Sequence, residues 1–457
     1  MKLTRRQVLV GAAAGAVGAT GIYELVDQLT GGSPQRTNAA KLLPEQHLLD
    51  GIRIVDSEGI EVLVPPLHHE ILTARVTPGR GDVRAARDEL EQLLAKLDAD
   101  YAPSPNGLGV TVAWGLPYFR RLTPDALRRH LPHDRRADRP VLFDAQRFPS
   151  DPFDTRLESN DVAILLRSDA RANIDDATKR LRASKLFELT SIRRGFAGGG
   201  FEGGRSLPKQ MAVAAQIPGA DLIPDTSELF LGFTSTQRAG MGPGTIANFE
   251  TLGYVDFRGS GYFRHGTHMH LSHIHEDLEA WYLNFDFDER VATAFKPNLR
   301  VKQDAQTVRQ GPHDVSTEAD VHREFRRSGQ IGHSASIQTT SRLQHDVVTH
   351  DGTVFERGTA IPVRADFNTL DNPFAWSEKP DEVGVLPAAG VHFVVFNPTG
   401  DDFRRNRLAM DGHLPQRKIE LEPRSRAQGF NEVLSTTHRQ NFIVPPRRNR
   451  SFPLAEL

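Results

Sequence analysis

The sequence predicts an α+β protein made of two ferredoxin-like domains, each with an antiparallel sheet and helices packed on it. The first half of the chain carries strand and helix patterns in the order βαββαβ, which is the ferredoxin-like supersecondary pattern. The second half repeats this order coarsely. The halves meet near residues 205–225, and 457 residues fit two domains of ordinary size.

Each element of the first half follows from hydrophobic periodicity. Alternation of apolar and polar residues indicates a strand, and apolar residues three and four positions apart indicate a helix. These patterns predict strands at 70–76, 109–114, 161–166 and 187–193, and helices at 82–97 and 174–186. The Gly-rich run from Gly195 to Gly204 is expected to be a loop. It is not a phosphate-binding loop, because no Gly-Lys-Ser/Thr follows it.

The second half shows fewer elements. Residues 268–275 alternate as a strand does, and 276–295 has the apolar spacing of a helix. The run Phe393-Val394-Val395-Phe396 predicts a buried strand.

The N-terminus has the plan of an export signal. Thr4-Arg5-Arg6 precedes an apolar stretch from Val8 to about Tyr23, which is typical of the twin-arginine variant. We therefore expect export of the folded chain by the twin-arginine translocase to the periplasm, the cell envelope or the medium. The expected boundaries are a signal segment at 1–30, a linker at 31–58, an N-terminal domain at 59–215 and a C-terminal domain at 216–457.

Composition excludes several classes of protein. Apolar residues at 38% and charged residues at 25% suit a globular chain with a core. The net charge of −2 argues against a nucleic-acid partner. The absence of cysteine excludes disulfides and thiolate ligation of a metal.

Beyond these patterns, an ordered series of short motifs resembles the dye-decolourising peroxidases. The resemblance covers roughly residues 60–450, and the order of the motifs is more distinctive than any one of them. The matching stretches are Gly109–Gly115 with Phe119, Asp161–Leu166, Glu228–Phe233, Glu279-Ala280-Trp281, Gly332-His333-Ser334-Ala335, Val363–Phe367, Gly390–Phe396 and Phe442–Pro446.

The resemblance implies a fold of the dimeric α/β-barrel type, a haem b cofactor, and hydrogen peroxide and a small-molecule reductant as substrates. It implies that His333 binds the haem iron and that Arg364 is catalytic and near the cofactor. The loop Gly232-Phe233-Thr234-Ser235-Thr236 corresponds to the distal loop of that family, which implies that Ser235 stands at a catalytic position and that the other four residues bind the cofactor. An oligomer is compatible with it.

One departure concerns the acid of the distal loop. Ser235 stands where the family has its aspartate, and Thr236 stands where it has the second glycine. An alternative alignment uses Gly244-Thr245 and puts Pro243 at that position, and no Asp or Glu occurs between Glu228 and Glu250. A hydroxyl of ordinary acidity is a poor base, so peroxidase turnover is expected to be weak or absent.

The residues themselves leave alternatives open for the metal. Imidazole is the commonest axial ligand of haem iron, and His345 and His350 compete with His333 for this role. Alternate histidines on a strand chelate copper, nickel or zinc, so a non-catalytic envelope protein that binds a transition metal is the second hypothesis. On the predicted strand, His268 and His270 share one face, and His273 and His275 share the other.

Export should depend on the arginine pair. Replacing Arg5 and Arg6 together with Lys keeps the positive charge but removes the pair that the translocase reads. We expect the double variant to remain in the cytoplasm, measured by fractionation and immunoblotting, while Lys2→Arg leaves export unchanged. Normal envelope localisation of the double variant would refute the signal assignment.

Overall fold

A computed structural model of the chain describes residues 22–30, 42–57, 60–79, 82–197, 205–233, 248–256, 261–302, 315–349, 352–373 and 386–457. The first half folds as the periodicity predicts. Its strands lie in the order β9-β3-β8-β4 and all pairs are antiparallel, which is the ferredoxin-like order. The elements are β3 (His68–Val76), α3 (Val83–Asp100), β4 (Gly109–Gly115), β8 (Val162–Ser168), α6 (Arg171–Ala183) and β9 (Phe187–Phe196).

The second half repeats this topology. Its strand order is β17-β11-β16 followed by β14 and β15, again antiparallel throughout. The prediction of two ferredoxin-like units is therefore confirmed. The strands are β11 (Thr267–Glu276), β14 (Val363–Arg364), β15 (Phe367–Thr369), β16 (Gly390–Asn397) and β17 (Leu434–Val444), and the helices are α8 (Leu278–Leu283), α9 (Phe287–Ala294), α10 (Glu318–Ser328), α11 (His333–Ser341) and α12 (Gly400–Met410).

The single helix expected at 276–295 is wrong. Glu276 belongs to strand β11, and the helical pattern is divided into α8 and α9. The division has a local cause, because the Asp286 side chain accepts from the backbone of Glu289 and the Glu289 side chain accepts from the backbone of Asp286. This capping box starts a new helix within the apolar pattern.

The two sheets join at both edges. Strand β4 pairs with β17 through Trp114 and Ile443, and β9 pairs with β15 through Phe196 and Asn368. Because β11 also pairs with both β16 and β17, the strands form a closed ring. An apolar cluster that includes Ile71, Leu165, Met269, Val394 and Phe442 fills its interior.

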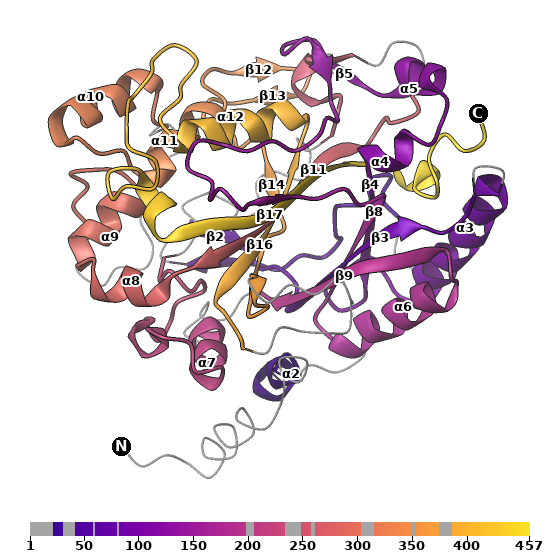
Figure 1. Ribbon diagram of the computed structural model, residues 1–457, viewed down its shortest axis with the longest axis horizontal. Helices are drawn as coiled ribbons and strands as arrows, with labels where there is room; N and C mark the ends of the chain where they lie inside the picture. The colour runs from indigo at the N-terminus through magenta and orange to yellow at the C-terminus, as the bar shows by residue number, and fades with distance from the viewer. Residues whose placement is uncertain are drawn as a thin grey trace.

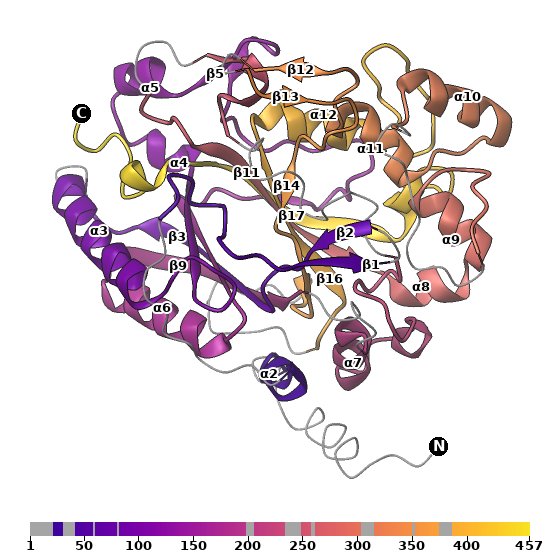
Figure 2. The same ribbon diagram turned by 180° about the vertical axis from the view of Figure 1, so that it is seen from behind.

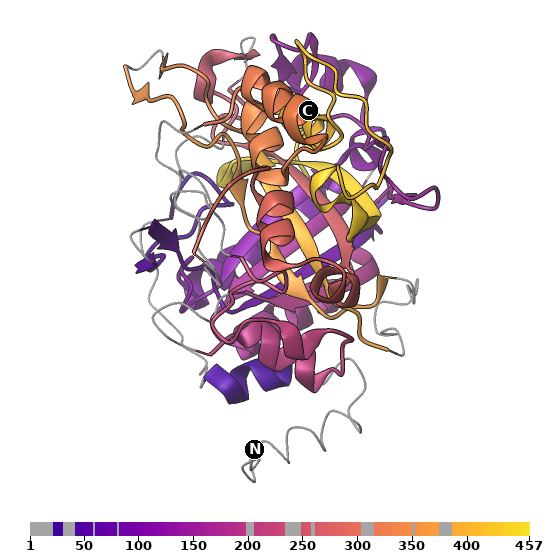
Figure 3. The ribbon, with the colours of Figure 1, turned by 90° about the vertical axis from the view of Figure 1, so that its left-hand side faces the viewer.

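Helices cover the outside of this ring. In Figure 1, α3 and α6 lie together on the first sheet, and α8 to α12 cover the second. Figure 2 shows the hairpin of β1 and β2 on the opposite side of the molecule, and Figure 3 shows the salmon and orange helices in front of the strands of the second unit. The arrangement leaves one apolar core inside the ring and further apolar layers under each set of helices.

The remaining elements are short. They are α2 (Glu24–Thr30), β1 (Ile54–Ser57), β2 (Ile60–Leu63), α4 (Leu116–Phe119), α5 (Pro124–His130), β5 (His133–Asp134), β6 (Arg139–Pro140), β7 (Arg156–Leu157), α7 (Leu207–Ala214), β10 (Val255–Asp256), β12 (Val347–Val348), β13 (Val354–Phe355) and the 3-10 turns Ala220–Leu222, Thr251–Gly253, Gly429–Glu432 and Arg447–Asn449. None of the helices in the described part of the chain could cross a bilayer.

Two segments that precede the first domain pack on this body. Tyr23 is 2% exposed, and its hydroxyl donates to Asp371 at 2.8 Å and accepts from the backbone N–H of Leu370. Gln46, within the expected linker, accepts from the backbone N–H of Val112 on β4 and donates to the carbonyl of Pro445, directly after β17. The Gln46 side chain therefore bridges the two sheets beside the junction of β4 and β17. Arg5 and Arg6 lie outside the described residues.

Candidate functional site

His333 begins helix α11 and is held there by close backbone packing. A Cβ at Gly332 would lie 2.2 Å from the carbonyl oxygen of Phe295, and a Cβ at Gly429 would lie 3.1–3.3 Å from His333. Gly429 also has a φ of +59°, which other residues rarely adopt. The imidazole lies 4.7 Å from the ring of Phe430, measured between centroids. The glycines thus bring the helix and the 3-10 turn at Gly429 close enough to orient the ring.

The imidazole of His333 is neutral at physiological pH. Burial lowers its pKa to about 3, and the charges of Arg364 and Arg407 act in the same direction. No group in the described part of the chain forms a hydrogen bond with either ring nitrogen. A neutral imidazole with a lone pair that no hydrogen bond occupies is the form that binds a metal.

Arg364 lies on the outer face of the second sheet, where the helices pack. Val363 faces the interior of the ring and is buried, whereas Arg364 and Asp366 are partly exposed on the other face. The Nε of Arg364 lies 3.7 Å from Oδ1 of Asp366. Side chains two positions apart on an extended chain share a face, so the strand itself places a carboxylate beside the guanidinium.

A second acid lies near Asp366. Glu276 ends strand β11, is 8% exposed, and has one carboxylate oxygen with no hydrogen-bond partner among the described residues. Burial and, to a smaller extent, the negative charge of Asp366 raise the pKa of Glu276 to about 8. At neutral pH the outer face therefore presents a protonated Glu276 near the Asp366 that pairs with Arg364.

The outer face between these groups is partly open and apolar. Alternation places Val391 and Phe393 of β16 on the same side as Arg364, and Ile274 of β11 is the cross-strand partner of Val391. All three are only partly buried, although their neighbours His392 and Val394, which face the interior, are fully buried. The site is thus a partly exposed apolar sheet surface with a cation and two acids on it and a neutral imidazole close by.

The distal loop predicted from the resemblance is described only at its start. Gly232 has a φ of +87°, and Phe233 is buried with its ring 5.2 Å from that of Phe295. Phe295 also contacts Gly332, so the loop begins beside the helix of His333. Thr234, Ser235 and Thr236 lie outside the described residues.

The competing histidines do not join this site. His345 is exposed on a loop after α11, and His350 lies outside the described residues. The structure therefore brings His333, and not His345, near Arg364.

The histidines of β11 pack in the core. His270 stacks on Phe403 of α12 at 3.4 Å and hydrogen-bonds with Asn441 and Ser272, while His273 lies on the other face, 4.3 Å from the ring of His392. His268, His270 and His273 are at most 1% exposed, and burial lowers the pKa of each. His275 is partly buried at the end of the strand. In the ranges that the structure describes, no three His, Asp or Glu side chains have the geometry of a metal site.

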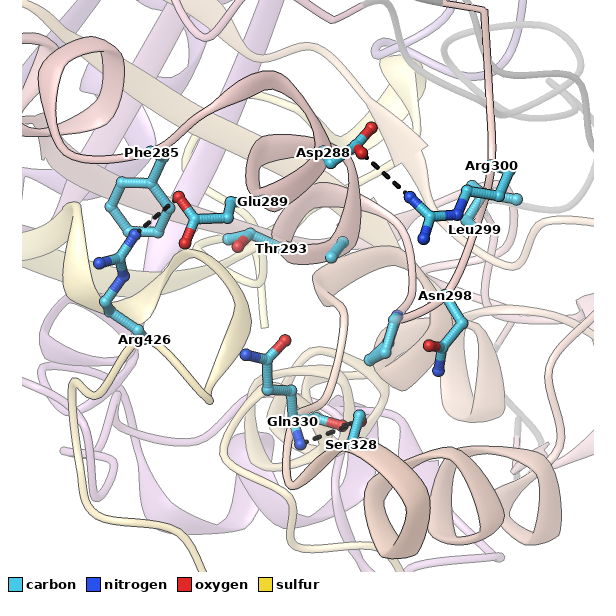
Figure 4. A pocket seen from close by; sticks show the side chains of 12 residues that line it. Phe285, Asp288, Glu289, Thr293, Asn298, Leu299, Arg300, Ser328, Gln330 and Arg426 are labelled. Carbon is cyan, nitrogen blue, oxygen red and sulfur yellow. Dashed lines mark hydrogen bonds and ion pairs between the residues drawn. The ribbon is translucent and has the colours of Figure 1, made fainter.

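A separate pocket of about 280 Å³ lies beside α9 (Figure 4). Its charged groups are paired with each other, Asp288 with Arg300 at 3.0 Å and Glu289 with Arg426 at 3.1 Å. Neither His333 nor Arg364 lines it. The pocket presents no unpaired charge to a ligand and is not part of the candidate site.

Sequence reasoning missed Asp366 and Glu276. The family resemblance predicts the acid between Glu228 and Glu250, and the apolar spacing of 276–295 places Glu276 at the start of a helix. The spacing of two residues between Arg364 and Asp366 on an extended segment was a usable signal. No sequence signal connects Glu276 with Asp366, because 90 residues separate them. They come together because β16 pairs with β11 on one side and with β14 and β15 on the other.

Comparisons with known proteins place the chain in a family but give no activity. The family model described as "Family of unknown function (DUF7405)" matches residues 66–446. No curated protein matches the chain. Similar solved structures include a variant of DypB from Rhodococcus jostii RHA1 in complex with heme, at 13% identity and a TM-score of 0.47, covering 85% of this chain and 95% of that one. The encapsulated DyP-type peroxidase from Mycobacterium smegmatis has 12% identity and a TM-score of 0.45, with coverage of 85% and 95%. Similarity at this level transfers neither a cofactor nor a site residue.

The raised pKa of Glu276 gives a pH signature. A carboxyl group whose pKa is about 8 when folded and near 4.3 when unfolded stabilises the fold fully below the lower value, and this stability is lost as the pH rises through the higher one. We expect the free energy of unfolding to fall by about 2–4 kcal/mol between pH 4.5 and 8 from this group. Glu276→Gln should remove that loss, measured by urea unfolding across this range.

Glu279→Gln provides the control, because Glu279 is an exposed acid on α8. It should keep the pH dependence of the wild type. An unchanged slope in Glu276→Gln would show that Glu276 is ionised in the folded protein at neutral pH.

Proposed function

This chain belongs to the DUF7405 family, and we propose that it is an exported haem-binding protein that uses hydrogen peroxide to oxidise a small-molecule reductant. One observation carries the proposal. A neutral imidazole, His333, lies within the electrostatic reach of Arg364, on the side of the second sheet where apolar residues are partly exposed. The ordered series of short motifs and the expected export signal are compatible with this function.

The residues present suit a haem in several respects. His333 offers a nitrogen lone pair, and imidazole is the commonest axial ligand of haem iron. Val391, Phe393 and Ile274 offer an apolar surface for a porphyrin face. Bound haem supplies the redox-active iron that the side chains of this chain lack. Arg342 and Arg407 lie near Arg364 and His333, respectively, and add the positive charge that suits haem propionates.

Side chains on the outer face of the second sheet would carry out the proton transfers. A reacting peroxide must lose a proton from one oxygen, and Asp366 is the carboxylate best placed to accept it beside the charge of Arg364. When the O–O bond breaks, with its two electrons supplied by bound haem, Arg364 would stabilise the negative charge on the departing oxygen. Glu276, protonated at neutral pH, can then return a proton to that oxygen. Asp366 thus supplies the base that the distal loop lacks.

The alternative is a non-catalytic haem-binding protein on the same fold. It is favoured by Ser235 at the position of the family's aspartate. The two functions share the haem site and differ in whether Asp366 takes part in turnover.

Haem binding should depend on His333. We expect His333→Ala to lose the Soret band shift on haem titration, with an affinity at least about 10-fold weaker. His345→Ala, an exposed histidine on the loop after α11, is the matched control and should bind as the wild type does. Equal binding by both variants, or no binding by the wild type, would remove His333 as the ligand.

Peroxide turnover should depend on Asp366. Asp366→Asn keeps the shape of the side chain and removes the base, so the rate of dye oxidation by the haem-loaded protein should fall about 10²–10⁴-fold while haem binding persists. Asp221→Asn, at an exposed acid far along the chain, should leave the rate unchanged. Wild-type protein that binds haem without turnover would support the non-catalytic alternative.

A further inference from the structure

The interior of the closed sheet contains a buried arginine that differs from the others. Among the described residues, four arginines are at most 2% exposed. Three of them contact a carboxylate within 3.0 Å, namely Arg193 with Glu158, Arg439 with Asp151 and Arg450 with Asp98. The fourth, Arg167, forms no ion pair with any acid in the part of the chain that the structure describes.

Arg167 faces the inside of the ring. It lies on β8, between Gly109 of β4 and His69 of β3 in the strand register. One of its Nη atoms donates to the backbone carbonyl of His47 at 2.6 Å, and its Nε has no hydrogen-bond partner in the ranges that the structure describes. Burial lowers the pKa of Arg167 to about 10, so the guanidinium is still charged at neutral pH.

Two histidines surround this charge. Burial and the positive charge of Arg167 lower the pKa of His47 and of His69 to about 3, so both are neutral. The Nε2 of His69 donates to the carbonyl of Pro66 at 2.9 Å, and no described residue forms a hydrogen bond with its Nδ1. Both ring nitrogens of His47 lack hydrogen-bond partners among the described residues, and the ring packs 5.0 Å from that of Phe396. Several polar nitrogens without partners are thus gathered at one end of the interior.

Buried charges in proteins are paired, and buried polar atoms are hydrogen-bonded, because desolvation without compensation is costly. A water molecule would satisfy a hydrogen bond but would leave the charge uncompensated. We propose that Arg167, with an N–H of His47, binds a small inorganic anion of halide size inside the closed sheet. The size follows from the apolar side chains that fill the interior, including Ile71 and Leu165, which are fully buried. The site lies on the face of the sheet opposite to the candidate haem site and does not depend on it.

The first test is the dependence of the melting temperature on bromide at constant ionic strength, with gluconate as the balancing anion. Gluconate is too large for the packed interior. The melting temperature of the wild type should rise by about 1–2 °C for each tenfold increase in bromide above the dissociation constant. Arg167→Met, which replaces the cation with an apolar chain of similar length, should not respond to bromide.

The matched control is Arg193→Met, a buried arginine of the same interior that already contacts Glu158. It should keep the bromide response of the wild type, whatever its own stability. An equal response in wild type and Arg167→Met would overturn the proposal.

A second measurement does not need a variant to fold. Crystals of the wild-type protein grown with bromide should give an anomalous peak within hydrogen-bond distance of the Arg167 guanidinium and the His47 ring. Anomalous maps without that peak, with only water-like density beside Arg167, would also overturn the proposal.

Discussion

Closure of the sheet is the constraint on which the rest of the structure depends. Each ferredoxin-like unit has two edge strands, and unpaired edges expose N–H and C=O groups that recruit other chains. Here the edges of one unit are paired with those of the other, at Trp114 with Ile443 and at Phe196 with Asn368. The pairing removes the edges and creates an enclosed interior. It also forces the two faces of every strand into different environments, one inside the ring and one under helices.

This division of faces explains where chemistry is possible. Inside the ring, groups are desolvated on all sides, so His47 and His69 are neutral. Arg167, which has no ion pair among the described residues, requires a small counter-charge. On the outer face of the second unit, helices α11 and α12 cover the sheet incompletely, and Val391 and Phe393 remain partly exposed. Arg364 can reach that face only because β14 pairs with β16 in a register that turns Val363 inward.

The first unit could be predicted almost entirely from periodicity. Strands β4 and β8 are mainly apolar, β3 and β9 alternate in part, and α3 and α6 have clear apolar stripes. The second unit was predicted less well. Strands β14 and β15 are too short for a periodic signal, and the capping box at Asp286 divides a pattern that is otherwise helical throughout. His333 and Arg364 could be proposed from a family resemblance. Glu276 could not, because its position depends on strand pairing between distant segments and its raised pKa depends on burial, which no local pattern encodes.

Gln46 has a consequence for where the folded unit begins. Its amide spans from Val112 to the carbonyl of Pro445, and the carbonyl of His47 accepts from Arg167. Leu49 packs where a side chain on Gly109 would otherwise lie. A shortened chain that starts at residue 59, the expected start of the N-terminal domain, would lack the contacts of Gln46, His47 and Leu49. The end of the ring that these residues cover would then be exposed. The segment from Gln46 to Leu49, before the first strand, is therefore an integral part of the folded body.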